Sequence, residues 1–257
     1  IRTSDDLETF PCWSPDGRTL YYCSAGVKHL INPIVPDSLI SQHLILKYDS
    51  IRYNLMSIPF DPESRSFGTP KVVINAAEEE KSISVPRVSP DGRYVLYTKG
   101  DYGQFHIWHK SSDLWVMDLE KDTCYALAES NSPDVDSFHS WSSNGRWFVF
   151  SSRRMDGNYT RPYIAYFDKQ GRAHKAFVLP QEDPEWNILL LKSYNVPELS
   201  KDAVLISPKE LHQCIYETEG EQAAYKANPT AIVNLDGTTG ASPKVDANEV
   251  LSDGLKQ

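Results

Sequence analysis

The residues of this sequence that could do chemistry are a few histidines and arginines. His106 and His109 stand three positions apart, and on a helix this spacing lets two imidazoles share one metal ion. Their apolar and aromatic neighbours, Phe105, Ile107 and Trp108, favour a strand or a loop, where the two histidines would be structural or exposed. Both interpretations stay open, and His106 and His109 are kept as candidate binding residues.

His139, Arg153 and Arg154 form a second group of candidates. His139 occupies, in the third copy of a repeat described below, a position that is proline in the other two copies. Its ring can contact a ligand or hydrogen-bond within the fold. An arginine presents a planar fork to a carboxylate, a phosphate or a sugar acid. The two arginines can instead pair with nearby acids, namely Asp134, Asp136 and Asp156.

The motifs of common catalytic and cofactor sites are absent from the sequence. It contains no Gly-x-Ser-x-Gly nucleophile elbow, no glycine-rich phosphate loop, no His-Glu-x-x-His helix and no Asp-rich calcium loop. Cys12, Cys23, Cys124 and Cys214 form no Cys-x-x-Cys pair, and we expect four free, buried, apolar side chains. We therefore expect no catalytic residue, no metal and no cofactor.

Composition and charge limit the classes of partner. The 257 residues are 40% hydrophobic and 24% charged, which is enough to build a core. With 35 acidic against 26 basic residues the net charge is -9, which argues against nucleic acid or an anionic membrane as the main partner. No apolar run reaches the roughly 18 to 20 residues of a membrane span. Residues 181–257 hold 13 acidic and 6 basic residues, so most of the negative charge lies there.

A repeated segment has to position these side chains. Phe10–Ser24, Val85–Lys99 and Phe138–Ser152 align as an apolar strand, a turn and a second apolar strand. Aspartate or asparagine in the turn can bond the local backbone, and the glycine that follows takes a positive φ without steric cost. These structural turn residues are Asp16 and Gly17, Asp91 and Gly92, and Asn144 and Gly145. The pattern predicts a three-residue hairpin with a glycine bulge in each copy.

A second pair of strands is expected after each hairpin. The predicted pairs are Asn54–Asp61 with Lys71–Ile74, Asp113–Leu119 with Cys124–Leu127, and Pro162–Phe167 with Lys175–Leu179. The second strand of each hairpin is apolar on both faces, so each sheet must be covered on both sides by its neighbours. Four strands in each of three units predict an all-β fold, a partial β-propeller with blades at about 7–76, 82–129 and 135–180.

The repeat resembles that of TolB-like β-propellers, a WD-repeat-like family. A blade of that family reads Pro-x-Trp-Ser-Pro-Asp-Gly, then an apolar strand, then Ser-x-Arg, and Phe150–Arg154 fits its end. The resemblance covers about residues 1–180, and Tyr159–Tyr163 and Tyr194–Glu198 resemble uncharacterised Bacteroidetes envelope proteins. It implies a periplasmic or outer-membrane-associated protein. Some propeller lyases that act on pectin fragments use channel histidines as metal ligands, which gives His139 its alternative interpretation.

Two regions depart from the repeat. Residues 25–52 form an insertion in the first blade, predicted to hold a short helix or an apolar cover over one end. Residues 181–257 form a non-repeat extension, in which Ser207 and Glu210 make a capping box that predicts a helix near 208–219, followed by a mobile tail. Three blades are too few to close a ring, so we expect further blades upstream of Ile1 or a second copy of the chain.

The sequence favours a non-enzymatic interaction or scaffold module of the cell envelope that binds a protein, a peptide or a glycan. This expectation rests on a rigid propeller with variable loops and no catalytic constellation. The alternative is a metal-dependent polysaccharide lyase or hydrolase that works in the propeller channel with His139 and Arg153. A third possibility is that the propeller regulates a larger enzyme.

Overall fold

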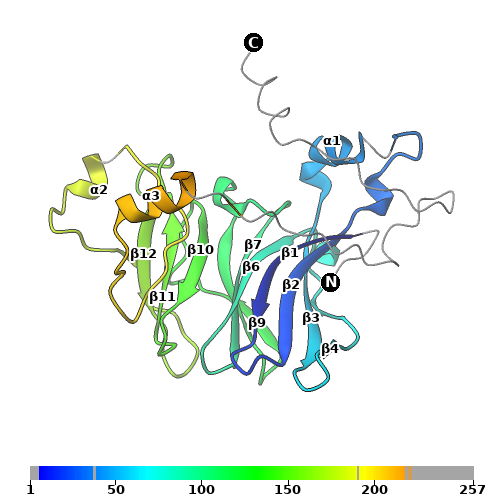
Figure 1. Cartoon of the computed structure of the whole chain (residues 1–257), viewed down its shortest axis with the longest axis horizontal. Coiled ribbons are helices and arrows are strands. Elements are labelled where there is room, and N and C mark those ends of the chain that lie inside the picture. The colour runs from blue at the N-terminus through cyan, green and yellow to red at the C-terminus, as the bar shows by residue number, and fades with distance from the viewer. Residues whose placement is uncertain (1–5, 37–38, 190, 218–219, 221–257) are drawn as a thin grey trace, which may run out of the picture. The chain divides into compact units, whose positions relative to one another are not determined.

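Three antiparallel sheets follow one another along the chain (Figure 1). The computed structural model describes residues 6–36, 39–189, 191–217 and 220. The first sheet contains β1 (Asp6–Trp13), β2 (Thr19–Gly26), β3 (Asn54–Asp61), β4 (Ser66–Phe67) and β5 (Lys71–Ile74). The second contains β6 (Ser82–Val88), β7 (Tyr94–Gly100), β8 (Asp113–Asp118) and β9 (Thr123–Ala126). The third contains β10 (Asp136–Trp141), β11 (Trp147–Ser152), β12 (Arg161–Tyr166) and β13 (Phe177–Val178).

The second and third sheets each run in simple order, β6-β7-β8-β9 and β10-β11-β12-β13. The first sheet has the order β1-β2-β3, with both β4 and β5 paired to β3. Short helical segments lie in the connections: η1 (Lys28–Leu30), α1 (Ile40–Ile45), η3 (Tyr48–Ser50), η4 (Ala76–Glu79) and η5 (His106–Trp108). The fold is therefore a partial β-propeller of three blades, as the repeat predicted.

The turn between the first two strands of each blade is closed by a serine that the sequence analysis did not use. Ser89 N donates to the Tyr94 carbonyl at 2.7 Å, and Tyr94 N donates back to Ser89 Oγ at 2.9 Å. Ser89 Oγ in turn donates to Asp91 at 2.5 Å. Ser14 and Ser142 make the same bonds in the other blades. The loop is thus four residues long, one more than predicted, because the serine hydroxyl replaces a backbone acceptor.

The glycines of these turns have the backbone conformation that their position requires. Gly17, Gly92 and Gly145 have φ of 68°, 76° and 63°. Each glycine N–H donates to the carbonyl of the serine three residues earlier, at 2.9, 2.8 and 2.9 Å. A residue with a Cβ is strained in this left-handed region, so the turn favours glycine for backbone reasons alone.

A β-bulge recurs in the first strand of every blade and was not predicted. Phe10, Val85 and Phe138 have φ of 52°, 52° and 51°, and the strand register shifts at each of them. Positive φ is rare for aromatic and especially for β-branched residues, so the rest of the blade must hold this conformation in place. The bulge carries the next residue, Pro11, Pro86 or His139, to a different face from the one that strict alternation would give.

The blades stack through apolar side chains on both faces. One buried cluster joins the first and second blades through residues such as Leu55, Val95 and Tyr97. The other joins the second and third blades through residues such as Leu96 and Phe150. Adjacent residues of β7 thus point into different clusters, which explains why the sequence of this strand is apolar throughout.

The cysteines correct one expectation. All four are free thiols, but Cys23 alone is buried, Cys12 is half-buried, and Cys124 and Cys214 are exposed. Cys124 lies on β9, the outermost strand of its blade, and Cys214 lies on a helix without buried residues. The prediction of four buried cysteines is therefore wrong, because it took residue type without position in the sheet.

The connections fall at two ends of the blades. One end, the turn end, holds the serine turns 14–19, 89–94 and 142–147 and the connections 61–66, 118–123 and 167–173. Two backbone hydrogen bonds show that turns and connections lie together: Leu119 N donates to the Arg93 carbonyl, and Phe167 N donates to the Arg146 carbonyl. The loop end holds the longer connections, whose described residues are 27–36 and 39–53, 101–112, and 153–160. The insertion of the first blade does contain a short helix, α1, and lies at the loop end (Figure 1).

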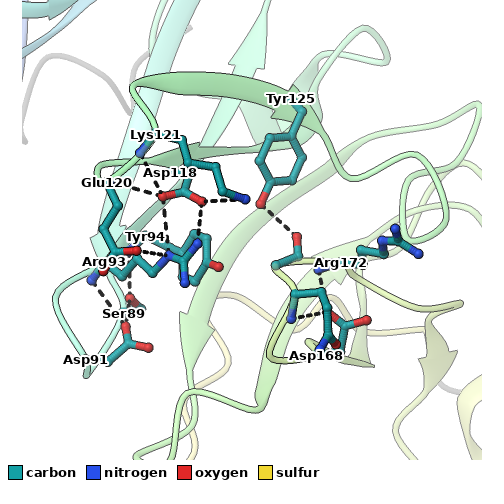
Figure 2. A network of polar contacts seen from close by, with 12 residues as sticks. Ser89, Asp91, Arg93, Tyr94, Asp118, Glu120, Lys121, Tyr125, Asp168 and Arg172 are labelled. Atoms are coloured by element: carbon teal, nitrogen blue, oxygen red, sulfur yellow. Dashed lines mark hydrogen bonds and ion pairs between the residues drawn. The ribbon is translucent and has the colours of Figure 1, made fainter.

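Polar contacts at the turn end tie the second blade to itself and to the third (Figure 2). Arg93 donates to both carboxylate oxygens of Asp118, at 3.3 and 2.9 Å, and this pairing lowers the pKa of Asp118. Glu120 accepts from the same guanidinium at 3.0 Å. Tyr125 OH donates to the Gly171 carbonyl at 2.7 Å and so links β9 to the third blade.

The chain after the last strand does not leave the blades at residue 180. The compact unit that contains the blades extends to Ala203, and the segment after α2 (Trp186–Leu189) covers part of the third blade. Ser151 Oγ donates to the Asn195 carbonyl at 2.5 Å, and Ser140 Oγ to the Pro197 carbonyl at 2.8 Å. The buried Arg161 donates to the Asn187 carbonyl at 2.7 Å.

The second unit begins at Val204 and contains α3 (Pro208–Glu217). The expected capping box is present, because Ser207 N donates to Glu210 at 2.8 Å and Glu210 N donates to Ser207 Oγ at 3.2 Å. Residues 218 and 219 of the predicted helix and the predicted mobile tail lie outside the described residues.

Candidate functional site

The connections of the three blades meet at the loop end. Gly103 N donates to the Ile51 carbonyl at 2.8 Å, which joins the second connection to the first. Tyr48 OH accepts from Gln104 N at 3.0 Å and from Phe105 N at 2.9 Å. A Cβ at Gly103, where φ is +67°, would overlap the Tyr48 ring. The insertion of the first blade therefore fixes the conformation of connection 101–112.

Two large side chains project from that fixed connection. Phe105 is 53% exposed and Trp108 is 68% exposed. The guanidinium of Arg153, from the third blade, lies 4.2 Å from the centre of the Trp108 ring, within the range of a cation–π contact. A tryptophan that stays exposed while a neighbouring blade holds its ring is unusual, because burial of the indole would lower the free energy of the folded chain. We name Phe105, Trp108 and Arg153 the aromatic platform.

The platform includes one predicted residue and two that the sequence analysis passed over. Arg153 was predicted as a binding candidate. Phe105 and Trp108 were treated only as neighbours of the histidines. A non-repeat connection that is rich in aromatic residues was an available signal for them, because such residues are not needed to complete a blade.

His106 and His109 lie on the other side of the same turn from the platform. They stand at the two ends of the η5 turn, which His109 N closes by donating to the His106 carbonyl at 2.9 Å. His106 is fully buried, and burial lowers its pKa to about 3. His109 is half-buried, and its pKa is also lowered by burial. The two histidines lie in a loop, as one of the two expectations had it, but this loop contains a single 3₁₀ turn, which places residues i and i+3 on one face.

His139 sits between the second and third blades. It is fully buried, and Nε2 donates to the Leu96 carbonyl on β7 at 3.0 Å. Burial lowers the pKa of His139 to about 3, so the ring is neutral at pH 7. The bulge at Phe138 is what turns this side chain toward β7. In this position the ring holds two blades together, and any contact with a ligand would require the blades to separate.

Arg154 differs from its neighbour Arg153. Its guanidinium contacts Asp136 at 2.5 Å, the Ser130 carbonyl at 2.6 Å and Ser152 Oγ at 2.9 Å, and it lies 4.5 Å from the centre of the Tyr163 ring. Asp136 is fully buried, and desolvation raises its pKa although Arg154 opposes the change. Arg154 thus neutralises a buried carboxylate, whereas Arg153 lies on the Trp108 ring as part of the platform.

A groove between the second and third blades was not predicted. Its volume is about 550 Å³, and segments 125–129 and 171–175 form its walls. Tyr125 OH closes one end on the Gly171 carbonyl, and Ser130 Oγ closes the other on the His174 carbonyl at 2.8 Å. Arg172 and Lys175 line it and are exposed. It resembles the crevice expected wherever two blades diverge, and it is the weaker candidate.

The described part of the chain contains neither a cluster of metal-binding side chains nor a helix that could cross a membrane. No group of three or more His, Cys, Asp or Glu residues there could hold a metal ion. No helix among the described residues has the length and apolar character that a membrane crossing needs.

Comparison with known proteins gives similarity at the level of fold. No protein-family model and no curated protein matches the chain. A putative TolB from Agrobacterium tumefaciens is 19% identical with a TM-score of 0.41, covering 68% of this chain and 50% of that one. The β-propeller domain of the Trilobed protease from Pyrococcus furiosus is 14% identical with a TM-score of 0.38, covering 71% and 46%. An oligogalacturonate lyase in complex with manganese is 12% identical with a TM-score of 0.44, covering 68% and 43%.

The chain spans half or less of the length of these three proteins. One of the three is a putative TolB, and the other two are an enzyme and a domain of an enzyme. At these identities they assign neither a family nor an activity to this chain.

Proposed function

We propose that this chain is a non-enzymatic binding module of the cell envelope, whose aromatic platform contacts a protein or peptide partner. The observation that carries the proposal is the position of Trp108, which is 68% exposed yet fixed between a structured turn and the Arg153 guanidinium. Tryptophan and arginine are the residues most enriched at the energetic centres of protein interfaces. A platform that is ordered before binding also loses little conformational entropy when a partner arrives.

The charge and surroundings of the platform favour a protein over a nucleic acid. The chain carries a net charge of -9, and Arg153 contributes one local positive charge beside two aromatic rings. Ile45 and Leu46 precede Tyr48 in the same loop end and are 72% and 81% exposed. Apolar groups around an aromatic and arginine centre are typical of a protein interface. Location in the periplasm or at the outer membrane is part of the proposal and rests on the resemblance to TolB-like repeats.

Enzymatic activity in the propeller channel is not the function we favour. The lyase or hydrolase hypothesis assigned His139 to a metal or substrate. His139 is fully buried and bonded to Leu96, and Arg153 is stacked on Trp108. No observation brings these two side chains to a common reacting atom.

Closing the propeller into a full ring requires more blades than the three that the structure describes. The outer face of the first blade has a hollow of about 220 Å³ lined by Glu8, Thr9, Pro11, Leu20 and Tyr22. We propose that another blade or a second copy of the chain packs on this face. The solution mass distinguishes these occupants, since a stable folded monomer would eliminate the second copy.

The binding proposal can be tested with a photo-reactive amino acid. It is placed at Phe105 on the platform and, as the matched control, at the exposed Gln170 on the turn end. In envelope extract we expect one protein to form a cross-link with position 105. The same protein should form no cross-link with position 170. Equal cross-linking at the two positions would contradict the proposal, and retention on a glycan array without a protein adduct would replace the protein partner with a glycan.

A further inference from the structure

Three buried polar atoms of connection 101–112 have no hydrogen-bond partner. They are His106 Nε2, His109 Nδ1 and Ser112 Oγ. The side chains of His106 and Ser112 are fully buried. Nearly all buried polar groups in native proteins are paired with protein, ordered water or an ion, so three such atoms in one short connection indicate a bound group.

Two of these atoms pack closely against Gly100, which has no side chain. The point that a Cβ on Gly100 would occupy is 2.8 Å from Ser112 Oγ and 3.2 Å from His106 Nε2. Both atoms therefore face the vicinity of a residue without a side chain. The His106 and His109 rings have centres 5.7 Å apart, on one side of η5. The backbone carbonyl of Tyr102 lies within reach of both imidazoles.

His106 is oriented as a metal-binding histidine usually is. Its Nδ1 lies 2.7 Å from the buried Ser84 Oγ, which fixes the ring from the side opposite to Nε2. When Nδ1 carries the proton and donates to Ser84, Nε2 keeps a free lone pair. Such a hydrogen bond on the second nitrogen orients and tunes histidine ligands in known metal sites.

We propose that His106 and His109 together bind one divalent transition-metal ion of borderline softness, Zn²⁺ or Cu²⁺. Imidazole nitrogen suits both ions, and the remaining positions fall to oxygen donors such as Ser112 Oγ, the Tyr102 carbonyl or water. Within the described residues no third His, Cys, Asp or Glu completes a cluster. The nearest acid to influence both rings, Asp101, is already paired with Lys81 at 2.7 Å. The proposed site is therefore a two-histidine site.

The ion would act on the shape of the loop end. His109 also packs against Tyr48 of the first blade, with ring centres 5.9 Å apart. Between the two histidines lie Ile107 and Trp108. An ion shared by His106 and His109 would cross-link the turn that presents Trp108, and the site would be structural and independent of any partner of the platform.

The test uses tag-free full chain, stripped with a chelator, and titration calorimetry with Zn²⁺. We expect one ion per chain and an increase in melting temperature on saturation. His109→Ala should weaken binding by more than about tenfold, because outer-shell changes alone commonly cost 10- to 100-fold and a lost ligand costs more. His174→Ala, which removes an exposed histidine at the turn end, should leave the affinity unchanged. Equal affinities of the chain and His109→Ala would overturn the proposal.

Electron paramagnetic resonance with one equivalent of Cu²⁺ gives a readout that does not depend on a variant folding. We expect the nitrogen splitting of two imidazoles in the unaltered chain and in His174→Ala. His109→Ala or, if that variant does not fold, His109→Gln should show a single imidazole. A spectrum without two imidazole nitrogens in the unaltered chain would contradict the site and leave a bridging water as the explanation of the three atoms.

Discussion

The turn end and the loop end of these blades are built on opposite principles. At the turn end each blade repeats one set of bonds, in which a serine hydroxyl closes the turn and a glycine takes a positive φ. At the loop end the three connections differ in length and sequence, and they leave Trp108 and Phe105 exposed and three atoms of connection 101–112 without partners. The comparison shows that the repeated bonds maintain the fold and that the irregular connections are free to carry binding.

The adjacent arginines show the same contrast over one residue. Arg154 is committed to the buried Asp136, and Arg153 lies on the exposed Trp108 ring. Both belong to the strand end Phe150–Arg154 that resembles the TolB-like pattern. A motif that fits a family therefore does not by itself distinguish a structural arginine from a binding arginine.

The largest expected effect comes from Arg154→Met. This change leaves Asp136, which is fully buried, without its cation, and breaking a buried pair typically costs about 3–5 kcal/mol. Chemical denaturation should show that loss in the free energy of unfolding. Arg153→Met is the matched control and should lose about 1 kcal/mol or less, because it removes a cation–π contact with the exposed Trp108 but leaves no buried charge without a partner. Equal losses in the two variants would remove the distinction between the arginines.

The next largest effect tests the turn end. Gly92→Val places a β-branched residue at φ 76°, which should cost about 1–3 kcal/mol. A Cβ at Gly92 meets no atom within 4 Å, so the loss would come from the backbone and not from a clash. Gly92→Asn is the control and should lose less, because asparagine tolerates this conformation. If both variants melt with the unaltered chain, the role assigned to the turn is wrong.

A different effect should appear below neutral pH and should grow with each unit of acidification. The pKa of His139 is lowered from 6.5 to about 3 in the folded chain, so the unfolded state binds a proton over this interval and the folded state does not. Stability from the neutral ring is complete above pH 6.5 and is lost as the pH falls toward 3, by about 1.4 kcal/mol per pH unit for one group.

Replacing His139 should remove its own share of this dependence, whereas His106, whose pKa burial also lowers to about 3, keeps its share. His139→Asn is expected to lower stability at pH 7 but to give a shallower decline between pH 6 and 4 in denaturation series. An unchanged slope would mean that the ring is not buried in the neutral form.

The sequence was sufficient to predict the blades but not the site. Repeats of Trp-Ser-Pro-Asp-Gly type specify strands and turns locally, so the three sheets could be predicted from spacing alone. The bulges at Phe10, Val85 and Phe138 could not, because positive φ at such residues is imposed by the surrounding sheet. The packing of residues 191–197 on the third blade depends on contacts of Ser140 and Ser151 with distant carbonyls.

The histidines show why the rest was missed. Type and spacing identified His106 and His109, but their burial and shared face follow from a 3₁₀ turn held by Tyr48, which is more than 50 residues away. His139 was predicted from a substitution in the repeat. Only its contact with Leu96 reveals that the ring joins two blades.

The claim that the loop end binds the partner and the turn end maintains the fold is tested most directly by measuring melting temperature and partner affinity in the same samples. The loop-end variant is Trp108→Ala with Arg153→Met, and the turn-end control is Lys169→Ala with Gln170→Ala, two exposed positions. Both variants should melt within a few degrees of the unaltered chain. The partner that cross-links at position 105 should bind the loop-end variant more than about tenfold more weakly and the control with unchanged affinity. Full affinity in the loop-end variant would contradict the account.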